Sequence, residues 1–316
     1  MTFIQKAFRN LHPLLQITFI ICVVITGAVL AEFFATYLFT WMYETGDTLP
    51  ELLKRPINVK SKTVISAALL LNCNFQILAL GTAGLAYTLL HGKAPGVGFS
   101  SMGKSIHLNK FLIGAIVITL GFSPFLDLTF RLNEWLLVEG STIHTKAAAL
   151  EAEAMRITMA MLKMETSNQF LVRLFAVAVL PAVCEEWLFR GTIQPIFAKW
   201  SGNIHIGIWV SAILFSAIHL QFFGFLPRLL LGAGFGYMVV ASGSLWPAVL
   251  GHFVNNGVAV FAAWWLGPEW LAEGMNPSEG SLGLTEAITS AIGAAAIIGS
   301  VWWLKENTKR PEAHSQ

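Results

Sequence analysis

Long apolar runs recur along almost the whole chain and are separated by shorter stretches in which charged residues gather. Eight of these runs approach the roughly 20 residues that a helix needs to cross a bilayer. They cover residues 14–42, 64–90, 111–137, 174–198, 204–222, 227–242, 245–267 and 284–304, and the sixth is short. The pattern predicts an all-α, polytopic membrane protein with about eight transmembrane helices.

The distribution of basic residues predicts an orientation. An even number of spans places both termini on one side of the membrane, and basic residues beside the first and last runs favour the cytoplasm. These residues are Lys6, Arg9, Lys305, Lys309 and Arg310. Four basic residues between positions 54 and 62 oppose this assignment. We expect an integral protein of a bacterial-type inner membrane, with both termini cytoplasmic.

Composition agrees with the hydropathy pattern. The chain is 55% apolar and 12% charged, whereas soluble domains have about 25% charged residues. Its net charge is only +2, and the basic residues form no stripe of the kind that binds nucleic acid. The lipid bilayer is therefore an expected partner, and nucleic acid is not.

The chain shows no internal repeat and no linker, so residues 1–316 are interpreted as a single transmembrane domain. Residues 145–163 mix Ala, Met, Leu, Glu and Lys, which favours an amphipathic surface helix. Residues 1–169 are expected to form scaffold helices. Residues 170–260 hold the polar positions of interest and are expected to form a catalytic core.

The run 174–198 contains Glu185, Glu186 and Arg190. Each ionisable side chain at bilayer depth costs roughly 2.5 to 3.5 kcal/mol on insertion scales, so the group needs partners and a purpose. On a helix, Glu186 and Arg190 share a face and can form an ion pair, while Glu185 points about 100° to one side. This predicts that Glu185 faces a cavity. Pro181 just upstream is expected to loosen one backbone hydrogen bond and to kink the helix, which would admit polar groups or water near the pair.

Two later runs carry histidines at helical spacing from a second useful residue. Phe215 lies four residues before His219, and His252 lies four residues before Asn256. An imidazole beside a carboxylate can deprotonate water, and an imidazole or amide can stabilise a tetrahedral oxyanion. The set therefore predicts peptide hydrolysis, with the Phe215 ring walling the pocket. Spacing alone leaves Asn255 open as an alternative amide donor.

The three motifs Glu-Glu-x-x-x-Arg, Phe-x-x-x-His and His-x-x-x-Asn follow one another at 185–190, 215–219 and 252–256. In this order the chain resembles the CAAX prenyl protease and bacteriocin-processing family, the CPBP intramembrane proteases, which include the type II CAAX endopeptidases. The resemblance implies a helical intramembrane endopeptidase with a conical catalytic cavity. Its substrate would be a peptide or protein at the membrane: a prenylated C-terminal peptide, a leader peptide or a membrane-protein segment.

The resemblance also implies roles for individual residues. Glu185 and His219 would activate water, while His252 and Asn256 would form the oxyanion site. Glu186, Arg190 and Phe215 would support the site. The match to the third motif favours Asn256 over Asn255.

Members of this family have also been described as metalloproteases, and Glu and His side chains can bind zinc. The candidate ligands would be Glu185, His219 and His252. The sequence lacks His-Glu-x-x-His, the arrangement of ordinary zinc proteases. We therefore expect a glutamate mechanism without a cofactor and keep a zinc-dependent protease as the alternative.

Two other classes stay open because intramembrane Glu, His and Arg also mark ion pathways: a polytopic transporter and a noncatalytic membrane scaffold. The expected topology also contains a conflict. His219 falls near the end of the fifth run and His252 near the start of the seventh, which simple alternation places on opposite sides. Either the chain makes a partial or tilted crossing around 224–227, or the expected boundaries are shifted.

Overall fold

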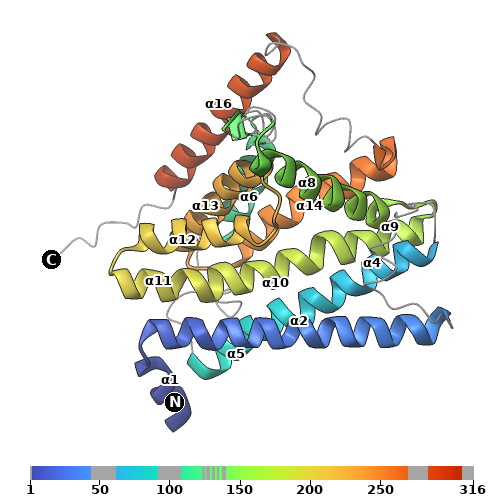
Figure 1. Cartoon of the computed structure of the whole chain (residues 1–316). Coiled ribbons are helices and arrows are strands. Elements are labelled where there is room, and N and C mark those ends of the chain that lie inside the picture. Colours follow the sequence, from blue (N-terminus) through green and yellow to red (C-terminus); the bar gives the residue numbers. More distant parts are fainter. Residues whose placement is uncertain are drawn as a thin grey trace.

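The computed structural model describes residues 2–43, 62–91, 108–122, 140–269 and 284–307, with a few isolated positions between 125 and 136. Every element within these ranges is a helix, which confirms the all-α class (Figure 1). Four helices in this part of the chain are long and apolar enough to cross a membrane. They are α2 (Pro13–Tyr43), the continuous helix Lys62–His91, α13 (Phe225–Ser242) and α14 (Trp246–Leu266).

The other expected spans are less complete. Three correspond to the shorter apolar helices Leu108–Phe122, Ile204–Ala217 and Ile288–Trp303, and residues 174–198 lie within an unbroken helical stretch from 167 to 201. The run expected over 111–137 is helical only as far as Phe122 among the continuously described residues. Helix length and composition thus support an integral membrane protein but do not establish eight crossings.

The first half of the chain forms one side of the bundle. Helix α1 (Phe3–Asn10) packs against α5 (Thr82–His91), and α2 packs along the helix formed by α4 (Lys62–Asn74), η1 (Phe75–Gly81) and α5. A Cβ atom at Gly27 would lie 1.9 Å from the Leu78 carbonyl oxygen, so only glycine permits this approach of α2 to η1. On its other side η1 packs against α10 (Leu180–Leu188), which brings the scaffold to the charged helix.

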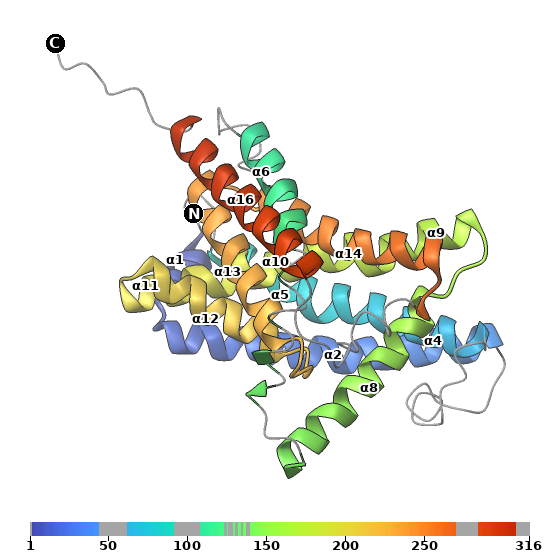
Figure 2. The same ribbon diagram turned by 90° about the horizontal axis from the view of Figure 1, so that it is seen from above.

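The second half of the bundle consists of α12 (Ile204–Ala217), α13 and α14. Helix α12 packs between α11 (Gln194–Ser201) and α13, and α14 packs between α10 and α6 (Leu108–Phe122). Helix α16 (Leu284–Asn307) lies beside α6 (Figure 2). The charged helix is therefore enclosed by helices from both halves of the chain.

Helix α8 (Thr142–Leu162) lies close to the range expected for an amphipathic helix. The Ser141 hydroxyl caps it by accepting a hydrogen bond from the His144 N–H. It runs obliquely to α2 in Figure 2, and it contacts α4 and α14. Its last turns, at Thr158, Met161 and Leu162, line a cavity that also has polar side chains in its wall.

The structure resolves the conflict over the two histidines. Helix α12 has 14 residues and ends at Ala217, five positions before the expected boundary. At 1.5 Å per residue it is about 21 Å long, which is short of the roughly 30 Å hydrocarbon core. His219 follows in the turn before α13, while His252 lies in the second turn of α14. The expected helix boundary was therefore shifted, and Nε2 of His219 and Nε2 of His252 lie 4.0 Å and 3.9 Å from the same carboxylate oxygen, Oε2 of Glu185.

Candidate active site

The charged motif lies on a long helix in which two π-helical segments interrupt the α-helical winding. Two π-helical segments flank α10, and such segments, with hydrogen bonds to the fifth residue along, recur at functional sites. The consecutive segments are α9 (Ser167–Arg173), η3 (Leu174–Val179), α10, η4 (Phe189–Ile193) and α11. The motif thus begins in α10 and ends in η4, the second of these π-helical segments.

Pro181, in the first turn of α10, has a direct structural effect. It has no N–H to donate to the carbonyl four residues earlier, which belongs to Val177. That carbonyl instead accepts a hydrogen bond from Nδ2 of Asn256 at 3.1 Å. The proline therefore frees a backbone acceptor, as the sequence predicts, and this acceptor ties the third motif to the first.

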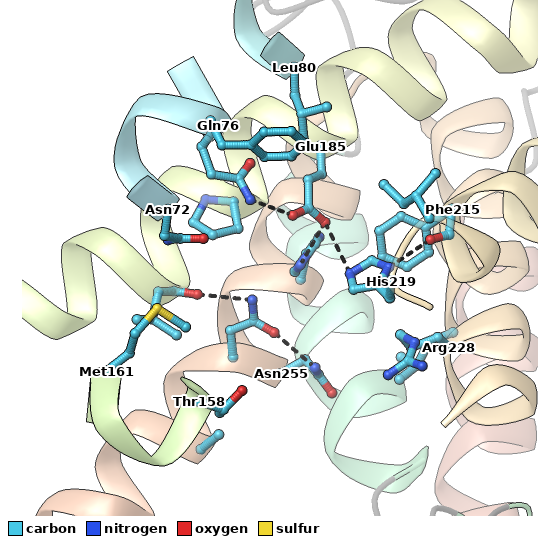
Figure 3. Close-up of a pocket in the computed structure, with 18 of the residues that line it drawn as sticks. Asn72, Gln76, Leu80, Thr158, Met161, Glu185, Phe215, His219, Arg228 and Asn255 are labelled. Carbon is cyan, nitrogen blue, oxygen red and sulfur yellow. Dashed lines mark hydrogen bonds and ion pairs between the residues drawn. The ribbon is translucent and has the colours of Figure 1, made fainter. Parts of the chain in front are cut away.

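A cavity of about 440 Å³ lies between α4, η1, α8, α10, α13 and α14. All four residues expected to be catalytic line it, together with Phe215 (Figure 3). Its polar lining side chains belong to Asn72, Gln76, Thr158, Glu185, His219, Arg228, His252, Asn255 and Asn256. The three motifs therefore meet at one cavity.

Glu185 is buried, and its two oxygens have different surroundings. Oε1 accepts a hydrogen bond from Nε2 of Gln76 at 2.7 Å. Oε2 is buried without a hydrogen-bond partner and lies 4.0 Å from Nε2 of His219 and 3.9 Å from Nε2 of His252. These gaps are too long for direct hydrogen bonds and short enough for a bridging water.

His219 is oriented by the last turn of α12, which ends just before it. Its Nδ1 lies 2.8 Å from the carbonyl oxygen of Phe215, which can only accept, so Nδ1 carries the proton. In the neutral ring Nε2 is then an unprotonated acceptor that faces Glu185. This tautomer is the one a general base requires.

His252 is held by the second glutamate of the motif. Its Nδ1 lies 2.9 Å from Oε1 of Glu186, and the same oxygen accepts from Nη1 of Arg190 at 2.9 Å. The Glu186 and Arg190 side chains are completely buried, and Nη2 of Arg190 also donates to the Gly232 carbonyl at 2.8 Å. The expected Glu186–Arg190 contact is present, and it extends to an imidazole.

The Phe215 ring lies between the two histidines. Its centroid is 5.1 Å from the His219 ring and 5.8 Å from the His252 ring, both in edge-on geometry. The Arg190 guanidinium sits 4.6 Å from the same centroid, within the range of a cation–π contact. Phe215 thus walls the pocket as expected and also fixes the spacing of its neighbours.

The two asparagines of α14 are linked to each other. Nδ2 of Asn255 donates to Oδ1 of Asn256 at 3.1 Å, and both residues line the cavity. Since Nδ2 of Asn256 donates one hydrogen to Val177, its second amide hydrogen is available to a substrate.

Comparison with known families gives an independent result. Residues 167–258 match the family described as type II CAAX prenyl endopeptidase Rce1-like. Residues 167–258 are therefore similar to that family, and we call them the Rce1-like region. The match covers less than a third of the chain, from α9 to the middle of α14, and includes every residue of the three motifs. No curated protein and no solved structure gave a significant match.

The matched family is one of membrane proteases, which agrees with the apolar helices around the Rce1-like region. The cavity is completed from outside the matched residues. The polar residue Gln76, in the apolar run 64–90, suits a helix-packing role by its sequence position alone; it does join η1 to α10, but its amide ends on Glu185. The expected division into a scaffold (1–169) and a core (170–260) therefore separates residues that share one cavity.

Arg228 lies within the Rce1-like region but was not singled out from the sequence. The available signal was a lone positive charge in the apolar run 227–242. Asp127 and Arg131 are four residues apart, a spacing that predicts a structural ion pair on one helix, and both lie outside the described residues.

Glu185, His219 and His252 are the candidate zinc ligands in the cavity. Among the described residues, no group of three or more His, Cys, Asp or Glu side chains is arranged to hold a metal ion. The nitrogens of His219 and His252 lie about as far from Oε2 of Glu185 as a bridging water requires. A bridging water would fit between these groups.

Proposed function

We propose that the protein is an intramembrane CAAX-type endopeptidase that hydrolyses a peptide bond with a water held between Glu185 and His219. The supporting observation is the buried, unpaired Oε2 of Glu185, which lies 4.0 Å from Nε2 of His219. Both atoms accept hydrogen bonds when the acid is ionised and the imidazole is neutral. A water between them directs its two hydrogens at these atoms and its lone pairs at a substrate.

The reaction follows from this placement. As the water oxygen bonds to the carbonyl carbon, its proton passes to the Glu185–His219 pair. His252 and Asn256 stabilise the resulting oxyanion by hydrogen bonding. The carbon–nitrogen bond then breaks, and the proton held by the pair passes to the amine. One carboxylate product and one amine product leave the cavity.

The proposed substrate is a CAAX-type peptide or protein at the membrane, with a lipidated cysteine before the cleaved bond. We further propose eight crossings, counting the short helices and the 167–201 helix, around a conical cavity. Both termini are proposed to face the cytoplasm of a bacterial-type cell. Labelling of single cysteines placed at each terminus, with a reagent that does not cross membranes, tests the orientation: labelling in intact cells contradicts it.

The decisive experiment compares purified wild type with Glu185→Gln on an S-farnesylated CAAX peptide in nanodiscs. The amide cannot accept the proton of water, so kcat should fall by about 10³-fold. Glu165→Gln is the control because Glu165 is exposed, outside the cavity, and its activity should match wild type. Equal melting temperatures show that the variants are folded. Wild-type rates in Glu185→Gln would contradict the proposal.

The zinc-dependent version uses the same side chains and is tested on the same protein. The metal-free mechanism predicts that activity survives dialysis against a strong zinc chelator. Loss of activity on chelation, with recovery when zinc is returned, would favour Glu185, His219 and His252 as zinc ligands.

A further inference from the structure

A positive charge lies in the catalytic cavity and has no described carboxylate within ion-pair distance. Arg228, on the first turn of α13, lines the same cavity as Glu185 and His219 (Figure 3). None of the ion pairs within 4.0 Å among the described residues involves it. Since a charged side chain in apolar surroundings is costly, its presence beside the reacting groups calls for an anionic partner.

The nearest acid is held away from Arg228 by an intervening amide. Nη1 of Arg228 donates to Oε1 of Gln221 at 3.0 Å, and Nη2 donates to the Gln221 backbone carbonyl. Nε2 of Gln221 in turn donates to Oε1 of Glu151 at 3.1 Å. The neutral Gln221 side chain therefore stands between Glu151 and the guanidinium. The charge of Arg228 is balanced at longer range by Glu151 and Glu185, without a direct contact to either acid.

One donor of this guanidinium is also unused. Nε of Arg228 is buried and has no hydrogen-bond partner, although arginine presents its donors as a planar fork that matches carboxylates. A buried N–H group without a partner is unfavourable, and a ligand that accepts from it relieves this cost. Charge, position and free donor together define a site for a carboxylate.

We propose that Arg228 binds the terminal carboxylate of the peptide substrate. This inference rests on the proposed protease function and adds a source of its specificity. A carboxylate at Arg228 and a carbonyl carbon beside Glu185 must both fit within one cavity of about 440 Å³. Cleavage therefore occurs a few residues from the C-terminus, and internal segments of a long chain are poor substrates.

A purely structural role for Arg228 makes a different prediction. The hydrogen bonds to Gln221 hold the turn after His219, in which Leu220 has the left-handed φ of 54° that is rare for a branched residue. This role uses Nη1 and Nη2 but gives no reason for the free Nε. It affects all substrates alike, whereas carboxylate binding separates peptides by their end group.

The test uses two peptides with an S-farnesyl cysteine followed by Val-Ile-Met, one ending in a carboxylate and the other in a carboxamide. Wild type should cleave the carboxylate peptide with kcat/KM about 10- to 100-fold higher, mainly through KM, because a hydrogen-bonded charge is lost in the amide. In Arg228→Gln this ratio should fall to about one. Arg228→Lys, which keeps the charge without the planar fork, should give an intermediate ratio.

The matched control is Arg156→Gln, because Arg156 pairs with Glu153 on α8 and does not line the cavity. Its ratio should equal that of wild type. Equal cleavage of the two peptides by wild type overturns the carboxylate site alone, and cleavage of neither overturns the proposed protease as well. If Arg228→Gln keeps the wild-type ratio, the carboxylate site is likewise overturned, and the proposed protease is unaffected. If that variant does not fold, the wild-type and Arg228→Lys ratios decide.

Discussion

Nδ1 of His252 is hydrogen-bonded to Oε1 of Glu186, at 2.9 Å. Because that oxygen also binds Arg190 at 2.9 Å, one buried carboxylate joins the helix-stabilising ion pair to an imidazole of the proposed oxyanion site. The bond turns Nε2 of His252 toward Glu185, 3.9 Å away. In catalytic triads a buried acid selects the histidine tautomer and orientation in the same way. Glu186 is therefore a positioning residue as well as half of an ion pair.

We predict that Glu186→Gln lowers kcat by about 100-fold or more, because the amide loses the charge that orients His252. It should also destabilise the protein by about 3 to 5 kcal/mol, since Arg190 is left buried without a counter-charge. Rates on the farnesylated peptide and chemical unfolding in detergent measure the two effects.

The control for Glu186 is Glu153→Gln, which breaks the partly exposed ion pair with Arg156 on α8. Such pairs contribute at most about 1 kcal/mol, so both its activity and its stability should stay close to wild type. If Glu186→Gln and Glu153→Gln have the same kcat and the same stability, Glu186 is not a positioning residue for His252.

A second prediction concerns Gln76, whose amide holds Oε1 of Glu185 at 2.7 Å. Gln76→Leu removes this donor, so Glu185 should lose its fixed orientation and kcat should fall by about 10-fold or more with little change in KM. Asn74→Leu is the matched control because its amide bonds within its own helix, to the Leu70 carbonyl. Steady-state kinetics on one peptide separate the two; a similar loss in both variants would show general damage to η1.

Helical phase predicted the charged motif well and its surroundings poorly. The four-residue spacing of Glu186 and Arg190 was sufficient for their ion pair, because both residues lie on one helix. Gln76 was equally consistent with ordinary helix packing. Its bond to Glu185 depends on how η1 packs against α10, across 109 positions of the chain, and no local pattern contains that information.

The position of His219 beyond the end of α12 could not be predicted, for a different reason. The apolar run continues through Leu220, Phe222 and Phe223, so hydropathy does not mark the end of α12 at Ala217. The change of direction depends on backbone conformation, including the positive φ of Leu220, a residue type that gives no turn signal. The effect of Pro181, by contrast, could be predicted from the sequence, because proline always lacks a backbone N–H.

The third prediction separates the two asparagines of α14. Asn256→Ala should lower kcat by about 10²- to 10³-fold if its second amide hydrogen stabilises the oxyanion. Asn255→Ala should cost less, because it removes only the 3.1 Å contact that supports Oδ1 of Asn256. Parallel kcat measurements decide between them, and a larger loss in Asn255→Ala would make Asn255 the oxyanion donor.

The fourth prediction uses Gly224 to move Arg228 without removing its charge. A Cβ atom at position 224 would lie 2.6 Å from Nη1 of Arg228, and the flexible guanidinium is the group that must shift. Gly224→Ala should therefore lower the carboxylate-to-amide ratio of kcat/KM several-fold while keeping the fold. Gly234→Ala is the control because no heavy atom lies within 4 Å of its added Cβ. Unchanged ratios in both variants would place the carboxylate elsewhere.

The last prediction concerns the pH dependence of stability and rests on Glu151, which lies on α8, outside the spans. Burial raises the pKa of this carboxyl above its ordinary value of 4.5, although the Arg228 charge and hydrogen bonds from Phe223 and Gln221 oppose the shift. A raised pKa means that the folded protein holds the proton more tightly than the unfolded chain. The resulting stability is fully present below the unfolded pKa and is lost as pH rises through the folded pKa.

Glu151→Gln keeps the shape of the side chain and cannot ionise, so it lacks this pH dependence. Melting temperatures of wild type and Glu151→Gln, measured in detergent from about pH 4 to pH 7, should therefore diverge, with wild type losing stability relative to the variant. The exposed Glu165→Gln should track wild type over the same range. A wild type that gains stability relative to Glu151→Gln as pH rises would show that the attraction of Arg228 outweighs burial. In that case Glu151 would be ionised in the folded protein, with the hydrogen bond from Gln221 stabilising the carboxylate.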